Sequence, residues 1–114
     1  MHFKLIVAIV DESMAERAIE AGREAGATGV TFIPEARGQG LSPERTFFGL
    51  SLRTMRVVIL MLVEEHRARA VLEAIGKAAN MEDGTGVAFQ LDVEDAVGVA
   101  RHVQKILPQV EEEL

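Results

Sequence analysis

The chain has 114 residues, the size of one domain, and its 48% of hydrophobic residues is enough to form a core. It contains no cysteine, which excludes a disulfide framework and a thiolate metal site, and its formal net charge of −6 disfavours a nucleic-acid-binding protein. The sequence lacks a signal-peptide pattern, and its longest apolar run, residues 57–63, is far shorter than the roughly 20 residues of a membrane helix, so we expect a cytoplasmic protein without direct membrane insertion.

The first half of the chain reads as a strand, a helix and a second strand. Residues 3–10 form a near-continuous apolar run, which is typical of a buried strand. A helical pattern follows over residues 14–25, and residues 28–35 read as the second strand. Three adjacent residues could cap this helix: Asp11, Glu12 and Ser13.

The second half repeats this order. We predict a strand over residues 55–63, a helix over residues 66–79 and a strand over residues 85–91. Residues 28–32 align with residues 85–89 at the matching place in the second copy. A β-α-β unit written twice predicts the α+β fold of a ferredoxin-like βαββαβ sandwich.

An extra helix is predicted at the C-terminal end. It begins at the acidic segment 92–95 and extends to about residue 107, before a proline. We therefore assign residues 1–107 to one domain and residues 108–114 to a frayed acidic tail.

The predicted strands are apolar on both faces, which a two-layer monomer cannot cover. Residues 7–9 and 60–62 are consecutive apolar residues, so neither strand alternates between apolar and polar positions. Packing of sheet against sheet in a closed oligomer is the simplest way to cover the second face. We therefore expect an obligate oligomer.

The connection over about residues 37–54 is the first candidate for a functional segment, since structureless loops longer than about 12 residues are usually functional or disordered. Its arginines and glycines suit an anionic ligand, because guanidinium groups bind phosphate through two hydrogen bonds and glycine allows close backbone approach. The alternative is a solubilising loop whose phenylalanine pair packs inside the oligomer. The residues concerned are Arg37, Gly38, Gly40, Arg45, Phe47, Phe48, Gly49 and Arg53, with Arg56 in the following strand.

A glycine turn before the last predicted strand is the second candidate. Gly84 and Gly86 flank Thr85, and such a turn can direct backbone N–H groups outward as a nest for phosphate oxygens. A G-x-G sequence is also common in turns that bind nothing, and this alternative remains open.

No metal site or catalytic set is predicted. The histidines, His2, His66 and His102, are scattered and have no partner at a familiar ligand spacing. Glu64, Glu65 and His66 are adjacent at a helix start, where we expect their side chains to point apart. Since the chain has no cysteine nucleophile, no G-x-S-x-G motif and no isolated acid pair, we expect no enzyme.

The order and spacing of three motifs resemble one family. KLIVAIV at residues 4–10, GATGVTF at residues 26–32, and Gly84-Thr85-Gly86 before DVEDAV at residues 92–97 are similar to a PII-like signalling protein of the nitrogen regulatory P-II superfamily. The resemblance covers residues 3 to about 100. It indicates a divergent member with a shortened form of the family's T-loop, here residues 37–54.

The resemblance implies a cytoplasmic homotrimer whose sheets face the threefold axis. It also implies an adenine nucleotide in each inter-subunit cleft, whose binding moves the T-loop and so regulates a membrane transporter or an enzyme. The implied nucleotide-binding residues are Thr31, Arg37, Gly38, Gly40, Gly84, Thr85, Gly86 and Arg101. The implied partner-binding residues of the loop are Arg45, Phe47, Phe48 and Arg53.

The chain also departs from the family pattern. It has no tyrosine, which excludes tyrosine nucleotidylylation, and Val87 replaces the family's lysine after the glycine turn. Gly98 and Ala100 take the places of an arginine pair, for which Arg101 is a shifted substitute. The ligand is therefore expected among AMP, ADP, ATP and cyclic nucleotides, with no metal, and AMP or a cyclic nucleotide fits these losses best.

Two other classes of protein remain as alternatives. One is a CutA-like trimer, structural or metal-associated, that binds no nucleotide. The other is a small ferredoxin-like enzyme that uses the cleft between subunits. Ordering of the T-loop by a nucleotide would separate the regulator from both.

Overall fold

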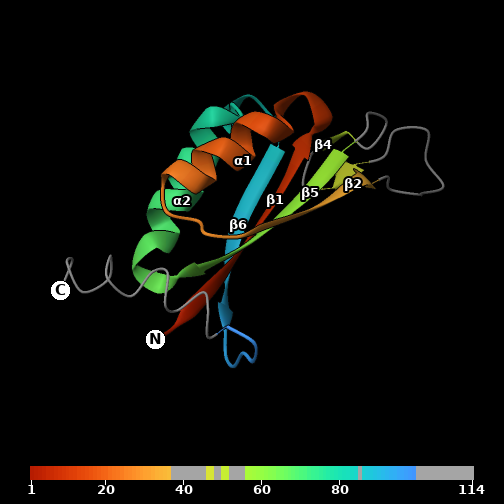
Figure 1. The fold of residues 1–114 in the computed structure, drawn as a ribbon. Coiled ribbons are helices and arrows are strands. Elements are labelled where there is room, and N and C mark those ends of the chain that lie inside the picture. Colours follow the sequence, from red (N-terminus) through yellow and green to blue (C-terminus); the bar gives the residue numbers. More distant parts are fainter. Residues whose placement is uncertain (37–45, 48–49, 52–55, 85, 100–114) are drawn as a thin grey trace.

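The computed structural model describes residues 1–36, 46–47, 50–51, 56–84 and 86–99, and these form a four-stranded sheet with two helices on one side (Figure 1). The main elements, in chain order, are β1 (Phe3–Asp11), α1 (Ala15–Glu24), β2 (Val30–Ala36), β5 (Arg56–Glu64), α2 (Glu65–Ala78) and β6 (Gly86–Val93). The short elements are η1 (Glu12–Met14), β3 (Thr46–Phe47), β4 (Leu50–Ser51) and η2 (Met81–Asp83).

The sheet has the split topology that the repeat predicts. Its strand order is β2-β5-β1-β6, and every neighbouring pair is antiparallel. The first β-α-β unit supplies β1 and β2, and β5 of the second unit lies between them. The ferredoxin-like prediction is therefore confirmed. Within the described residues, β3 and β4 pair with each other as a separate two-stranded sheet.

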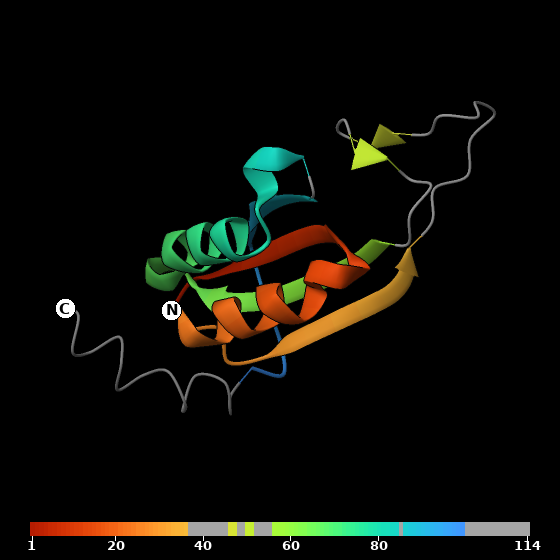
Figure 2. The same ribbon diagram turned by 90° about the horizontal axis from the view of Figure 1, so that it is seen from above.

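The core lies between the sheet and the two helices, which Figure 2 shows on the same side of the sheet. Ile6 and Met61 point from the sheet into this layer, and Val71 and Ile75 of α2 are buried against them. Gly22 brings α1 close to the sheet, because a Cβ there would lie 2.5 Å from Cε of Met61. Neither helix in the described part of the chain is long and apolar enough to cross a membrane.

The other face of the sheet is apolar and only partly buried. Val7 of β1 lies opposite Leu60 of β5 and Phe89 of β6, and all three side chains are half-buried. Leu91 remains 49% exposed on its strand. Both helices pack on the opposite side, so no described helix covers this face. The sequence argument for apolar residues on both faces therefore agrees with the structure.

The predicted final helix is wrong over its first turn. β6 continues through Asp92 to Val93, because its ladder with β1 extends to the pair Phe3 and Val93. Residues 94–99 contain no helix. An acidic segment that resembles a helix cap is therefore the end of a strand and the irregular residues after it. The rest of this predicted helix, the tail over residues 108–114 and most of the connection over residues 37–54 lie outside the described residues.

Candidate ligand-binding site at one end of the sheet

Four strand ends meet at one end of the sheet, and they bring the two sequence candidates together. Asp11 at the end of β1 lies opposite Arg56 at the start of β5, and Ala36 at the end of β2 pairs with the same arginine. On the other side of β1, Val10 lies opposite Gly86 at the start of β6. Both ends of the long connection and the glycine turn therefore lie at the same end (Figure 1).

Arg56 is a buried cation at this end of the sheet, with an exposed fraction of only 5%. Its Nη1 lies 4.0 Å from Oδ2 of Asp11. A buried charge is costly unless it is paired, and a guanidinium fork can bind a carboxylate or a phosphate. Arg56 was noted beside the connection but is not among the nucleotide-binding or partner-binding residues predicted from the sequence. Its position directly after the connection, at the start of the most apolar strand, is the sequence feature that could have identified it.

Asp11 has a second role, as the cap of the first helical turn. Its Oδ1 accepts hydrogen bonds from the backbone N of Ser13 at 3.0 Å and from Oγ of Ser13 at 2.8 Å. Of the three capping candidates, Asp11 is therefore the one that caps η1. The two bonds hold one carboxylate oxygen, while the other oxygen faces Arg56.

The structure requires glycine at the two glycine positions of the turn for different reasons. Gly84 has φ of 78° and nothing within 4 Å of the position a Cβ would take, so its glycine supplies a left-handed backbone conformation. Gly86 instead lies against β1, because a Cβ there would be 2.8 Å from the backbone oxygen of Ile9. Thr85 between them lies outside the described residues.

The structure brings only part of the predicted site together. Gly84 and Gly86 lie at the same sheet end as Arg56, and Thr31 is exposed in β2, opposite Leu60. Phe47 belongs to β3, for which only the backbone is described. The remaining predicted residues lie outside the described part of the chain: Arg37, Gly38, Gly40, Arg45, Phe48, Arg53 and Arg101.

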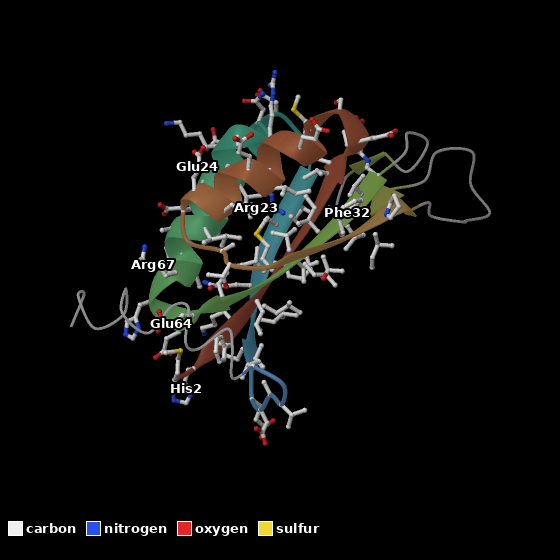
Figure 3. All side chains as sticks on the ribbon, in the orientation of Figure 1. His2, Arg23, Glu24, Phe32, Glu64 and Arg67 are labelled. Atoms are coloured by element: carbon white, nitrogen blue, oxygen red, sulfur yellow. The ribbon has the colours of Figure 1, made fainter. Side chains whose placement is uncertain are left out.

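A second cluster of polar groups lies at the other end of β5, where Figure 3 labels Glu64. Glu64 is 3% exposed, and its carboxylate accepts from the backbone N of His66 at 2.9 Å and contacts Nδ1 of the same residue. The expectation that Glu64, Glu65 and His66 point apart was wrong, because Glu64 is the extended N-cap residue and turns its carboxylate back over the helix. Their ligand atoms lie within 4.8 Å of one another, but the bonds present are those of a helix cap.

The same end of the sheet carries an ion pair on the surface. Nζ of Lys4 in β1 donates to Oδ1 of Asp92, which lies directly opposite it in β6. This hydrogen bond, together with the charge of Lys4, lowers the pKa of the Asp92 carboxyl. The pair is far from Arg56, which begins the strand that Glu64 ends.

Two interleaved β-α-β units in one antiparallel sheet define the ferredoxin-like class of α+β proteins. Within that class, the chain belongs to the nitrogen regulatory protein P-II family, whose sequence profile matches residues 3–103. No curated protein sequence gives a significant match.

Solved structures of PII-like proteins share this fold. The CPII structure from Thiomonas intermedia with ADP, AMP and acetate has a TM-score of 0.66 at 21% identity, over 86% of this chain and 92% of that one. A CPII structure from the same organism with ADP, AMP and bicarbonate has a TM-score of 0.62 at 23% identity, over 84% and 94%. A PII-like signaling protein from Thermus thermophilus has a TM-score of 0.60 at 20% identity, over 82% and 87%.

Proposed function

We propose that the protein is a regulator that binds an adenine nucleotide at the Arg56 end of the sheet and reports through the connection over residues 37–54. The observation that carries the proposal is the strand register, which places a buried guanidinium, the glycine turn and both ends of the connection together. Arginine and outward backbone N–H groups are the donors that phosphate oxygens accept from. The CPII structures that share the fold contain ADP and AMP, which supports this ligand class.

The proposal includes a homotrimer with the nucleotide in the clefts between subunits. The partly buried face that includes Val7, Leu60 and Phe89 supports it, because a soluble protein rarely leaves a contiguous apolar face of this kind uncovered. Further copies of the chain are the proposed cover, sheet against sheet around a threefold axis. The family resemblance implies that Thr31 lies near the adenine, and Thr31 lies opposite Leu60 in the register, so the proposed nucleotide site would border this interface.

The proposed signal is a population shift of the connection. A ligand changes a conformational equilibrium only if it binds the two states unequally. Because the connection begins after Ala36 and ends before Arg56, a phosphate bound at Arg56 acts directly on its base. We propose that a loop state selected in this way contacts a transporter or an enzyme through Arg45, Phe47, Phe48 and Arg53.

The test is isothermal titration of the purified protein with ATP, ADP, AMP and cyclic AMP, with and without magnesium. We expect saturable binding to the wild type and at least about tenfold weaker binding to Arg56→Gln, because the variant loses a charged donor to phosphate. Arg69→Gln is the control, since Arg69 is exposed and pairs with Glu73 on α2. Unchanged affinity in Arg56→Gln would place the site elsewhere. Silence of the wild type across the panel would reject nucleotide binding and favour the CutA-like alternative.

The trimer is tested separately by light scattering after gel filtration. Leu60→Asp places a charge in the middle of the apolar face, so we expect monomers. Ala70→Asp is the matched control, because Ala70 is exposed on α2, and it should leave the assembly unchanged. A Leu60→Asp protein with the mass of the wild-type assembly would show that this face is not the interface.

A further inference from the structure

The register places Asp11 between the two groups that form the proposed phosphate site. β1 is a central strand, with β5 on one side and β6 on the other. Asp11 faces Arg56 on β5, and the residue before it, Val10, faces Gly86 on β6. A phosphate that reaches both Arg56 and the glycine turn therefore lies beside the Asp11 carboxylate.

The Asp11 carboxylate is held in this place. Its Oδ1 is fixed by the two hydrogen bonds from Ser13, and its Oδ2 lies 4.0 Å from Nη1 of Arg56. The Asp11 side chain is 32% exposed, whereas that of Arg56 is 6% exposed. A ligand from solvent therefore meets the anion as well as the cation, and the capping bonds oppose its movement away.

We propose that Asp11 is a specificity-determining residue, which makes this site favour adenine nucleotides of low negative charge; the inference rests on the proposed function. Each further phosphate adds about one negative charge to the ligand. The repulsion between a fixed carboxylate and the ligand grows with the charge of the ligand. The Asp11 charge also offsets part of the attraction that Arg56 exerts on the phosphates. The preferred order without magnesium is therefore AMP over ADP over ATP, and the Asp11 charge is its cause.

The test removes the charge and keeps the cap. Asp11→Asn retains a side-chain oxygen that can accept from Ser13, and asparagine is as good a helix cap as aspartate. Glu12→Gln is the matched control, because Glu12 is the exposed neighbour in η1 and its replacement changes the net charge equally. Asp11→Ser, which also retains a capping oxygen, is the second variant if Asp11→Asn does not fold.

The measurement is the affinity for AMP, ADP and ATP without magnesium, at low and at high salt. Because the Asp11 side chain is partly exposed, the effective dielectric constant is about 60, between about 20 near a protein surface and about 80 in water, and one unit charge about 4 Å from the carboxylate then changes affinity on the order of tenfold. We therefore expect Asp11→Asn to tighten ATP binding on the order of tenfold, ADP less and AMP least. Glu12→Gln should change all three affinities less than about twofold, and salt should reduce the difference between the variants.

Each outcome decides between the two proposals. Equal changes for the three nucleotides, or none, would show that Asp11 acts only as a cap and overturn this inference while the nucleotide site stands. ATP binding by Asp11→Asn, together with a wild type that binds AMP but not ATP, would support it, because the carboxylate would then be the barrier to ATP. Silence of both proteins with all three nucleotides would overturn the proposed function, and this inference with it.

Discussion

Gly86→Ala should destabilise the protein, because the added methyl group has no room at the start of β6. The new Cβ would lie 2.8 Å from the backbone oxygen of Ile9, 3.2 Å from Cγ1 of Val10 and 3.4 Å from Cε of Met81. The closest of these atoms belongs to the backbone of the neighbouring strand, so relief requires a shift of β6 away from β1. Overpacking of this kind costs about 1–3 kcal/mol.

Part of this loss is offset, because alanine lowers the conformational entropy of the unfolded chain relative to glycine. This effect stabilises the folded state by about 0.4–1 kcal/mol. The net loss of unfolding free energy is therefore about 1–2 kcal/mol. A change of this size lowers the melting temperature of a domain of this length by several degrees. Urea and thermal unfolding followed by circular dichroism, at one fixed protein concentration, would measure it.

Two other glycines provide the comparison. Gly29 has nothing within 4 Å of the Cβ position and no positive φ, so Gly29→Ala should stabilise the protein by about 0.4–1 kcal/mol through the unfolded chain alone. Gly84→Ala meets no atom either, but its φ of 78° should cost about 1–2 kcal/mol. If Gly86→Ala is as stable as Gly29→Ala, the close approach of Gly86 to β1 is not a constraint, and the reasoning fails.

Two further predictions concern the other end of the sheet. Lys4→Met should make the free energy of unfolding fall less steeply at acidic pH. Lys4 lowers the pKa of Asp92 in the folded protein, so the stability that the pair contributes is present above the unfolded pKa and is lost as pH falls below about 4. Denaturant midpoints at several pH values check this, and parallel curves for variant and wild type would contradict it. Glu64→Ala should cost about 1–2 kcal/mol through the lost α2 cap, and Glu64→Gln, which keeps an acceptor for the His66 N–H, should cost less. Equal losses in urea unfolding would show that the cap is not the source.

The fold could be predicted because its signals are local and repeated. Apolar runs and helical periodicity occur in the same order in both halves, and a repeated β-α-β unit has few ways to form one sheet. The strand and helix bounds differ from the predicted ones by a few residues at most. The prediction of a final helix was wrong at its start. Residues 92–95 carry the acidic side chains of a helix cap, but tertiary pairing with β1 holds Asp92 and Val93 in a strand.

The candidate site was harder to predict because it depends on contacts between distant residues. The Gly84 and Gly86 turn is visible in the sequence, but its place beside β1 follows only from the register between Val10 and Gly86. The pairing of Asp11 with Arg56 has the same origin. The sequence pattern does not locate the start of a helix to a single residue. It therefore could not show that Glu64 precedes α2 and caps it.

The interleaved strand order has a consequence for how the two halves depend on each other. The three interfaces of the sheet are β2 with β5, β5 with β1, and β1 with β6, so each joins a strand of one half to a strand of the other. Neither half contains a strand pair of the main sheet by itself. Cleavage between β2 and β5 would therefore yield two fragments that regain this sheet only by binding each other. The covalent connection makes that association intramolecular, and so independent of protein concentration.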